Sequence, residues 1–124
     1  MPQIFSVFQI VIDKDLSDLI NKEGFDCHVK SKARMEAMLD GDVRRGVMHD
    51  CYTKVAEVVA DDLDHVFEVG NIGPEDRIER FEKMTSINVG DIIADADGVC
   101  SVVNNVGFTP LAPSFHKMVL KELA

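Results

Sequence analysis

The chain has 124 residues, of which 46% are hydrophobic and 28% charged, a composition typical of one folded globular domain. Its 22 Asp and Glu residues against 13 Lys and Arg residues give a formal net charge of −9. Nucleic acids and anionic membranes are therefore disfavoured as partners, because both would be repelled.

The location of the protein is predicted from what its first residues and its apolar runs lack. The N-terminus has no basic start and no small-residue cleavage site of a secretory signal. No apolar run approaches the roughly 20 residues that a membrane-spanning helix needs. The three cysteines leave at least one thiol unpaired, which is typical of a reducing compartment. These features predict a cytoplasmic protein.

The first half of the chain contains strand and helix patterns in turn. Residues 3–12 are rich in Ile, Val and Phe and predict a buried strand. Asp13 and Gly24 are typical residues for the start and the end of a helix over 14–23. The pattern after Gly24 predicts, in chain order, a helix over 31–39, a loop over 43–50 and a strand over 52–60.

The second half is predicted to contain two helices, a hairpin and a terminal helix. Asp61 or Asp62 caps a helix that extends to about Val69, and Pro74 fits the first turn of a helix over 75–83. Asp95-Ala-Asp-Gly is a hairpin signal. It lies between strand patterns over 87–94 and 99–103, which are followed by a third strand over 107–111 and a terminal helix over 114–123.

Together these elements predict one α+β domain over residues 1–124. It comprises an N-terminal strand, several short helices and a C-terminal β-hairpin or small antiparallel sheet. Within it we distinguish an acidic helical region over 57–83, a hairpin module over 86–111 and the C-terminal helix over 114–123.

The residue types and their spacing give little support for a catalytic site or a metal site. No Gly-x-Ser-x-Gly or comparable nucleophile motif occurs, so an enzyme is not expected. A zinc set of the right residue types exists, but it contains two adjacent ligands and no Cys-x-x-Cys, and buried free cysteines are the preferred interpretation. It comprises Cys27, His28, His49 and Cys51. Whether it ever holds a metal stays open at this point.

Calcium and nucleotide binding are also disfavoured by the spacing of the residues. Asp91, Asp95 and Asp97 suggest a calcium loop, but Val99 and Val106 stand where further oxygen ligands are required. No glycine-rich phosphate loop is present. We therefore expect no cofactor.

The acidity is concentrated in one third of the chain. Residues 57–97 contain 12 acidic and 3 basic side chains, a net charge of −9 that accounts for the whole imbalance. Two sets of these carboxylates recur at steps of three and four, which places neighbours about 5–6 Å apart on a helix face. The first would share one face if the helix begins early enough, and the second repeats the step: Glu57, Asp61, Asp64 and Glu68, then Glu75, Glu79 and Glu82. The candidate binding residues are Glu57, Asp61, Asp62, Asp64, Glu68, Glu75, Asp76, Glu79 and Glu82.

One stretch resembles a known module. Ser86-Ile-Asn-Val-Gly-Asp, followed by Val102 to Gly107-Phe108, is similar to the Ser-x-Ser-Val-Gly-Asp…Gly-Phe module of small phage and mobile-element proteins, including the YodL-like group. Asn88 stands where the family usually has serine, and the resemblance covers roughly residues 52–108. It implies a phage or plasmid accessory protein. The motif residues themselves are interpreted as structural, with Gly90 and Asp91 forming a turn into a strand.

Phage origin and acidity together lead to a functional hypothesis. A protein with carboxylates spaced on the scale of DNA phosphates could act as a non-enzymatic DNA mimic, binding the basic groove of a host DNA-handling protein in the host cytoplasm. Candidate partners are a topoisomerase such as DNA gyrase, a restriction or defence nuclease, and RNA polymerase. The alternatives are an acidic surface that serves solubility alone, and a phage structural or assembly protein that self-associates through Met35, Met38 and the terminal helix. A homodimer stays open.

Overall fold

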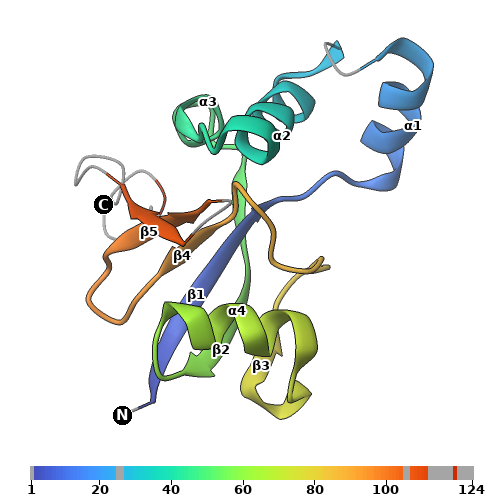
Figure 1. Ribbon diagram of the computed structural model, residues 1–124. Helices are drawn as coiled ribbons and strands as arrows, with labels where there is room; N and C mark the ends of the chain where they lie inside the picture. The colour runs from blue at the N-terminus through green and yellow to red at the C-terminus, as the bar shows by residue number, and fades with distance from the viewer. Residues whose placement is uncertain (1, 25–26, 105–106, 112–118, 120–124) are drawn as a thin grey trace.

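An antiparallel sheet of six strands forms the middle layer of the molecule (Figure 1). The computed structural model describes residues 2–24, 27–104, 107–111 and 119. The strands lie in the order β3-β2-β1-β4-β5-β6. Their bounds are β1 Gln3–Ile10, β2 Tyr52–Ala60, β3 Ile78–Arg80, β4 Ile92–Ala94, β5 Cys100–Val103 and β6 Phe108–Pro110.

Helices cover both faces of this sheet. The covering helices are α2 Val29–Asp40, α3 Arg44–Met48 and α4 Leu63–Ile72. The described residues also form α1 Lys14–Glu23, which buries none of its residues, and a short 3-10 helix over Glu75–Arg77. Val66 and Val69 of α4 pack on one face, and Ala33 and Ala37 of α2 pack on the other together with Val47 of α3. The architecture is α+β, as the sequence predicts.

The central strand β1 explains why the core has two halves. Its side chains alternate, so Phe5 and Val7 contact the α4 half while Phe8 and Ile10 contact the α2 and α3 half. All four side chains are buried. A strand that is apolar on both faces belongs in the middle of a three-layer arrangement.

Several predicted element ends are confirmed by capping contacts. Asp13 accepts a hydrogen bond from the Leu16 N–H at 2.8 Å, and Gly24 ends α1 with a positive φ of 92°. Asp62 caps α4 in the same way, by accepting from the His65 N–H. The strand over 52–60 and the hairpin turn at Asp95–Gly98 are also confirmed.

Three local predictions are wrong. The strand predicted over 87–94 begins only at Ile92, because residues 88–91 form a turn in which the Asp91 N–H donates to the Asn88 carbonyl. Residues 44–48 form α3 rather than part of a loop, and Gly46 permits it because a Cβ there would lie 2.7 Å from the Tyr52 ring. Residues 75–83 do not form a helix: after the 3-10 turn, Ile78–Arg80 pair with β2 as strand β3. Two apolar side chains in nine residues bury too little surface to hold a helix against that sheet pairing.

The predicted helix over 114–123 lies outside the described residues, except for Val119, which is helical and buried. Among the described residues, no helix combines the length and apolarity needed to cross a membrane.

Candidate functional site

The start of α4 gathers the first group of candidate carboxylates. Asp61 precedes the helix, Asp62 caps it and Asp64 lies in its first turn, and all three are exposed. The Asp61 N–H donates to His65 Nδ1 at 3.0 Å, so this nitrogen is already an acceptor. The Asp61 carboxylate lies 3.6 Å from the same nitrogen. In a neutral imidazole a nitrogen that accepts carries no proton, so it cannot donate a hydrogen bond to the carboxylate.

These carboxylates line an open depression together with a fourth one from the hairpin. The depression has a volume of about 490 Å³. Gln3 pairs with Ala60, and Ser6 pairs with Ala94, so the ends of β2 and β4 flank the same end of β1. The lining residues are Gln3, Phe5, Asp61, Asp62, Leu63, Asp64, Asp95 and Phe108.

Asp95 was not among the predicted binding residues, although the Asp-Gly turn signal marked its position. Its Oδ1 accepts from the N–H groups of Asp97 and Val99 at 2.9 and 3.0 Å, which closes the hairpin turn. Among the described residues, no group of three His, Cys, Asp or Glu side chains is placed to hold a metal ion.

The exposed face of α4 continues the acidic surface and adds apolar side chains. Asp64 and Glu68 are one turn apart, and both are exposed. Phe67 is 39% exposed beside them, and Ile72 at the end of the helix is 84% exposed. We call Asp61, Asp64, Phe67, Glu68 and Ile72 the α4 surface.

The remaining candidates do not join one helical stripe. Glu57 lies in β2 between Ala56 and Val58, which both face α4, so its side chain points to the opposite face of the sheet. Its cross-strand partner is Glu79 of β3, which lies on that same face. The predicted alignment of Glu57 with Asp61, Asp64 and Glu68 is therefore wrong, because residue 57 belongs to a strand.

Two of the predicted carboxylates are paired with nearby cations. Glu57 lies 3.0 Å from Lys54 Nζ, and Glu75 accepts from Arg80, which lowers the pKa of the glutamate. Asp76 and Glu82 are exposed and lie after α4. Of the predicted carboxylates, seven have no Lys or Arg partner in the described ion pairs. Four lie at the start and on the outer face of α4, and three follow that helix: Asp61, Asp62, Asp64 and Glu68, then Asp76, Glu79 and Glu82.

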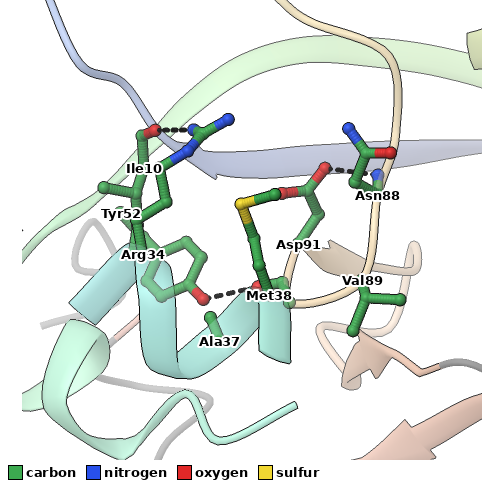
Figure 2. Close-up of a pocket in the computed structure, with 9 residues that line it drawn as sticks. Ile10, Arg34, Ala37, Met38, Tyr52, Asn88, Val89 and Asp91 are labelled. Carbon is green, nitrogen blue, oxygen red and sulfur yellow. Dashed lines mark hydrogen bonds between the residues drawn. The ribbon is translucent and has the colours of Figure 1, made fainter. Parts of the chain in front are cut away.

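The motif that resembles the phage module lies inside a polar network (Figure 2). Asp91 accepts at one oxygen from Gln9 Nε2 at 3.0 Å and from the Asn88 N–H at 2.9 Å. Burial raises the pKa of Asp91 to about 6 and raises that of Tyr52, whose hydroxyl donates to the Gly90 carbonyl. The hollow beside them measures about 10 Å³, room for one water molecule at most.

The network explains the motif in structural terms. Gly90 has a φ of +92°, and a Cβ on it would lie 2.6 Å from the Ala37 backbone of α2. Ile87 is buried against α4, where a Cβ on Gly70 would meet its side chain. Residues 86–91 thus join the two helical layers beside the C-terminal end of the inner strand β1.

Two cysteines and one histidine of the described residues have structural roles: Cys51, Cys100 and His28. Cys51 and Cys100 are buried, and burial raises the pKa of both thiols, that of Cys100 to about 11. His28 Nδ1 accepts from the Lys30 N–H at 3.0 Å and so caps α2. These thiols are not poised as nucleophiles, because the reactive form is the thiolate.

Comparison with known proteins adds no relative from which a role could be transferred. No family model, no curated protein and no solved structure matches the chain.

Proposed function

We propose that the protein is a non-enzymatic, phage-encoded inhibitor that acts in the host cytoplasm by placing its acidic α4 surface in the DNA-binding groove of a host protein. The observation that carries this proposal is the concentration of the entire net charge of −9 in residues 57–97. Within that region, Asp61, Asp62 and Asp64 line one depression with Asp95. Grooves built for DNA present Lys and Arg side chains, which such carboxylates attract in place of phosphates.

The apolar side chains of the α4 surface support a protein partner over a merely solubilising surface. Phe67 lies between Asp64 and Glu68, and Ile72 lies one turn beyond Glu68. Exposed apolar side chains give a solubilising surface no benefit, whereas in an interface they provide area that is removed from water. The carboxylates then provide attraction and orientation, while Phe67 and Ile72 provide contact area.

The proposal is tested with purified DNA-handling enzymes: DNA gyrase, a restriction nuclease and RNA polymerase. We expect the protein to bind at least one of them in competition with duplex DNA, and binding to weaken steeply as salt rises. The triple variant Asp61→Asn, Asp64→Asn and Glu68→Gln removes three charges but leaves the Asp62 cap intact. It is expected to lose this binding.

A matched control separates the position of the charges from their number. The variant Asp15→Asn, Asp18→Asn and Glu23→Gln removes three exposed charges from α1. It is expected to bind like the natural chain, and circular dichroism checks that both variants fold. Equal loss in both variants, or binding that does not respond to salt, would contradict DNA mimicry.

A second candidate function, self-association as a structural or assembly protein, is favoured by an apolar patch at the other end of the molecule. Met38 and Leu39 at the end of α2 are exposed, Leu39 by 69%, and they line a hollow of about 350 Å³ with Met35 and Arg34. If this patch forms the contact, sedimentation will show an oligomer that Leu39→Glu dissociates and that the α4 triple variant leaves intact. A monomer at all accessible concentrations would exclude this function.

A further inference from the structure

A groove lies between α1 and the end of β1. Its charge is opposite to that of the α4 surface. Its volume is about 340 Å³, at the lower end of the range for small-molecule sites. Figure 1 shows α1 standing away from the sheet, joined to β1 by an extended stretch. The lining residues are Gln9, Ile10, Val11, Ile12, Ser17, Ile20, Asn21, Arg34, Lys83 and Thr85.

The charge of this groove contrasts with that of the chain. None of the ten lining residues is Asp or Glu, although the chain has 22 of them, and two are cations, Arg34 and Lys83. Arg34 Nη1 donates to the Ile10 carbonyl at 2.7 Å, which fixes the guanidinium at the groove. Lys83 is exposed and belongs to none of the ion pairs among the described residues.

Arg34 is not fully neutralised by the carboxylate on its other side. Asp91 lines the neighbouring hollow of Figure 2 and not this groove. Arg34 and Asp91 do not form an ion pair among those of the described residues. The guanidinium and the Lys83 ammonium therefore leave the groove positively charged.

The walls combine apolar and polar groups. Val11, Ile12 and Ile20 provide aliphatic surface, and α1 buries none of its residues although one of its faces is apolar. Ser17 and Asn21 lie one turn apart on α1 and add a hydroxyl and an amide to the rim. An apolar wall with a few convergent polar groups is typical of a ligand site.

We propose that this groove binds a small organic anion with an apolar body. The anionic head lies between Arg34 and Lys83, where it accepts charge-assisted hydrogen bonds, and the body lies along Val11, Ile12 and Ile20. A carboxylate and a phosphate monoester share this chemistry. The site is separate from the α4 surface, so the inference goes beyond the function proposed above and does not depend on it.

The test uses three eight-carbon probes that differ only in the head group: octanoate, octyl phosphate and octanol. Each is titrated into the full ¹⁵N-labelled chain, and the amide signals of α1 and residues 83–85 are followed by NMR. We expect saturable shifts there with at least one of the anions and about tenfold weaker binding of octanol, because octanol cannot use the two cations. Whichever anion binds more tightly identifies the preferred head group.

Lys83→Gln tests the charge directly, since the side chain is exposed and its loss does not disturb the core. We expect it to weaken binding of the preferred anion about tenfold, the loss of one charge-assisted contact. The matched control Lys22→Gln removes a charge from an exposed position of α1 that does not line the groove. Three results would each overturn the proposal: octanol binds as tightly as both anions, Lys83→Gln does not change the affinity, or neither anion produces saturable shifts.

Discussion

At the scale of single residues, Asp91 combines a structural role with an energetic cost. Its carboxylate holds Gln9 and the Asn88 backbone in place, but burial raises its pKa from 3.8 to about 6. A carboxyl whose pKa is higher in the folded state binds protons more tightly there, so its contribution to stability is complete below pH 4 and is lost as pH rises through about 6.

We therefore predict that Asp91→Asn becomes more favourable relative to the natural chain as pH rises. The asparagine oxygen still accepts the hydrogen bonds of Asp91 but carries no charge. Between pH 4 and 7 the difference in unfolding free energy is expected to change in favour of the variant, by at most about 3 kcal/mol.

Urea unfolding of both proteins at several pH values measures that difference. Effects of other carboxyls, such as Asp42, whose pKa the neighbouring Arg44 lowers to about 2, cancel because both chains contain them. A difference that stays constant from pH 4 to 7 would contradict the raised pKa. A ¹³C titration of the Asp91 carboxyl gives a second, direct reading.

At the scale of elements, the sequence predicted what local side chains decide. Asp13 and Asp62 are short acceptors that satisfy the free N–H groups of the first helical turn, and they mark α1 and α4 correctly. The turn of the β4–β5 hairpin was equally predictable, because Asp95 closes it through hydrogen bonds within four residues. Such signals need no partner from elsewhere in the chain.

Strand β3 could not be predicted in this way. The charges of residues 75–83 recur at helical spacing, yet Ile78 pairs with Val58, and the Phe81 N–H donates to the Val55 carbonyl at 2.8 Å. This pairing connects residues about twenty positions apart, and it overrides local propensity. For the same reason the stripe of carboxylates failed at Glu57, which belongs to β2, whereas Asp64 and Glu68 lie in α4 as the spacing predicts.

The depression beside α4 shows the corresponding limit for the candidate site. Asp95 joins it because β2 and β4 are both neighbours of β1, a relation fixed by the register of two strand pairs. The groove between α1 and β1 likewise depends on Arg34 of α2 reaching the Ile10 carbonyl. Neither contact can be predicted from the spacing of residues in the sequence.

At the scale of the whole molecule, the two ends of the protein differ in net charge. Figure 1 shows α4 and β3 at one end and α2 and α3 at the other. The net charge of −9 in residues 57–97 lies mainly in and around the α4 and β3 end, so like charges repel one another there in the folded state. This repulsion acts on the free protein, whether or not a partner binds.

Glu68 and Glu82 are both exposed and belong to none of the described ion pairs. We therefore predict that neutralising these two side chains stabilises the folded chain at low salt. Neither lies in the first turn of a helix, so neither loss sacrifices a favourable dipole interaction. The double variant Glu68→Gln and Glu82→Gln is expected to raise the Tm by about 2 °C in 0.01 M salt, since removing like-charge neighbours gains a few tenths of a kcal/mol each. At about 1 M salt, where the screening length falls from roughly 30 Å to roughly 3 Å, the gain should vanish.

Asp15→Asn with Glu23→Gln is the matched control, because it also removes two exposed charges and its effects on the α1 dipole oppose each other at the two ends of the helix. Those residues lie near Lys14 and Lys22, so little repulsion is relieved and we expect little change in Tm at either salt concentration. Thermal unfolding followed by circular dichroism compares the two variants. If both gain equally at low salt, the repulsion belongs to the chain as a whole and not to the end formed by α4 and β3.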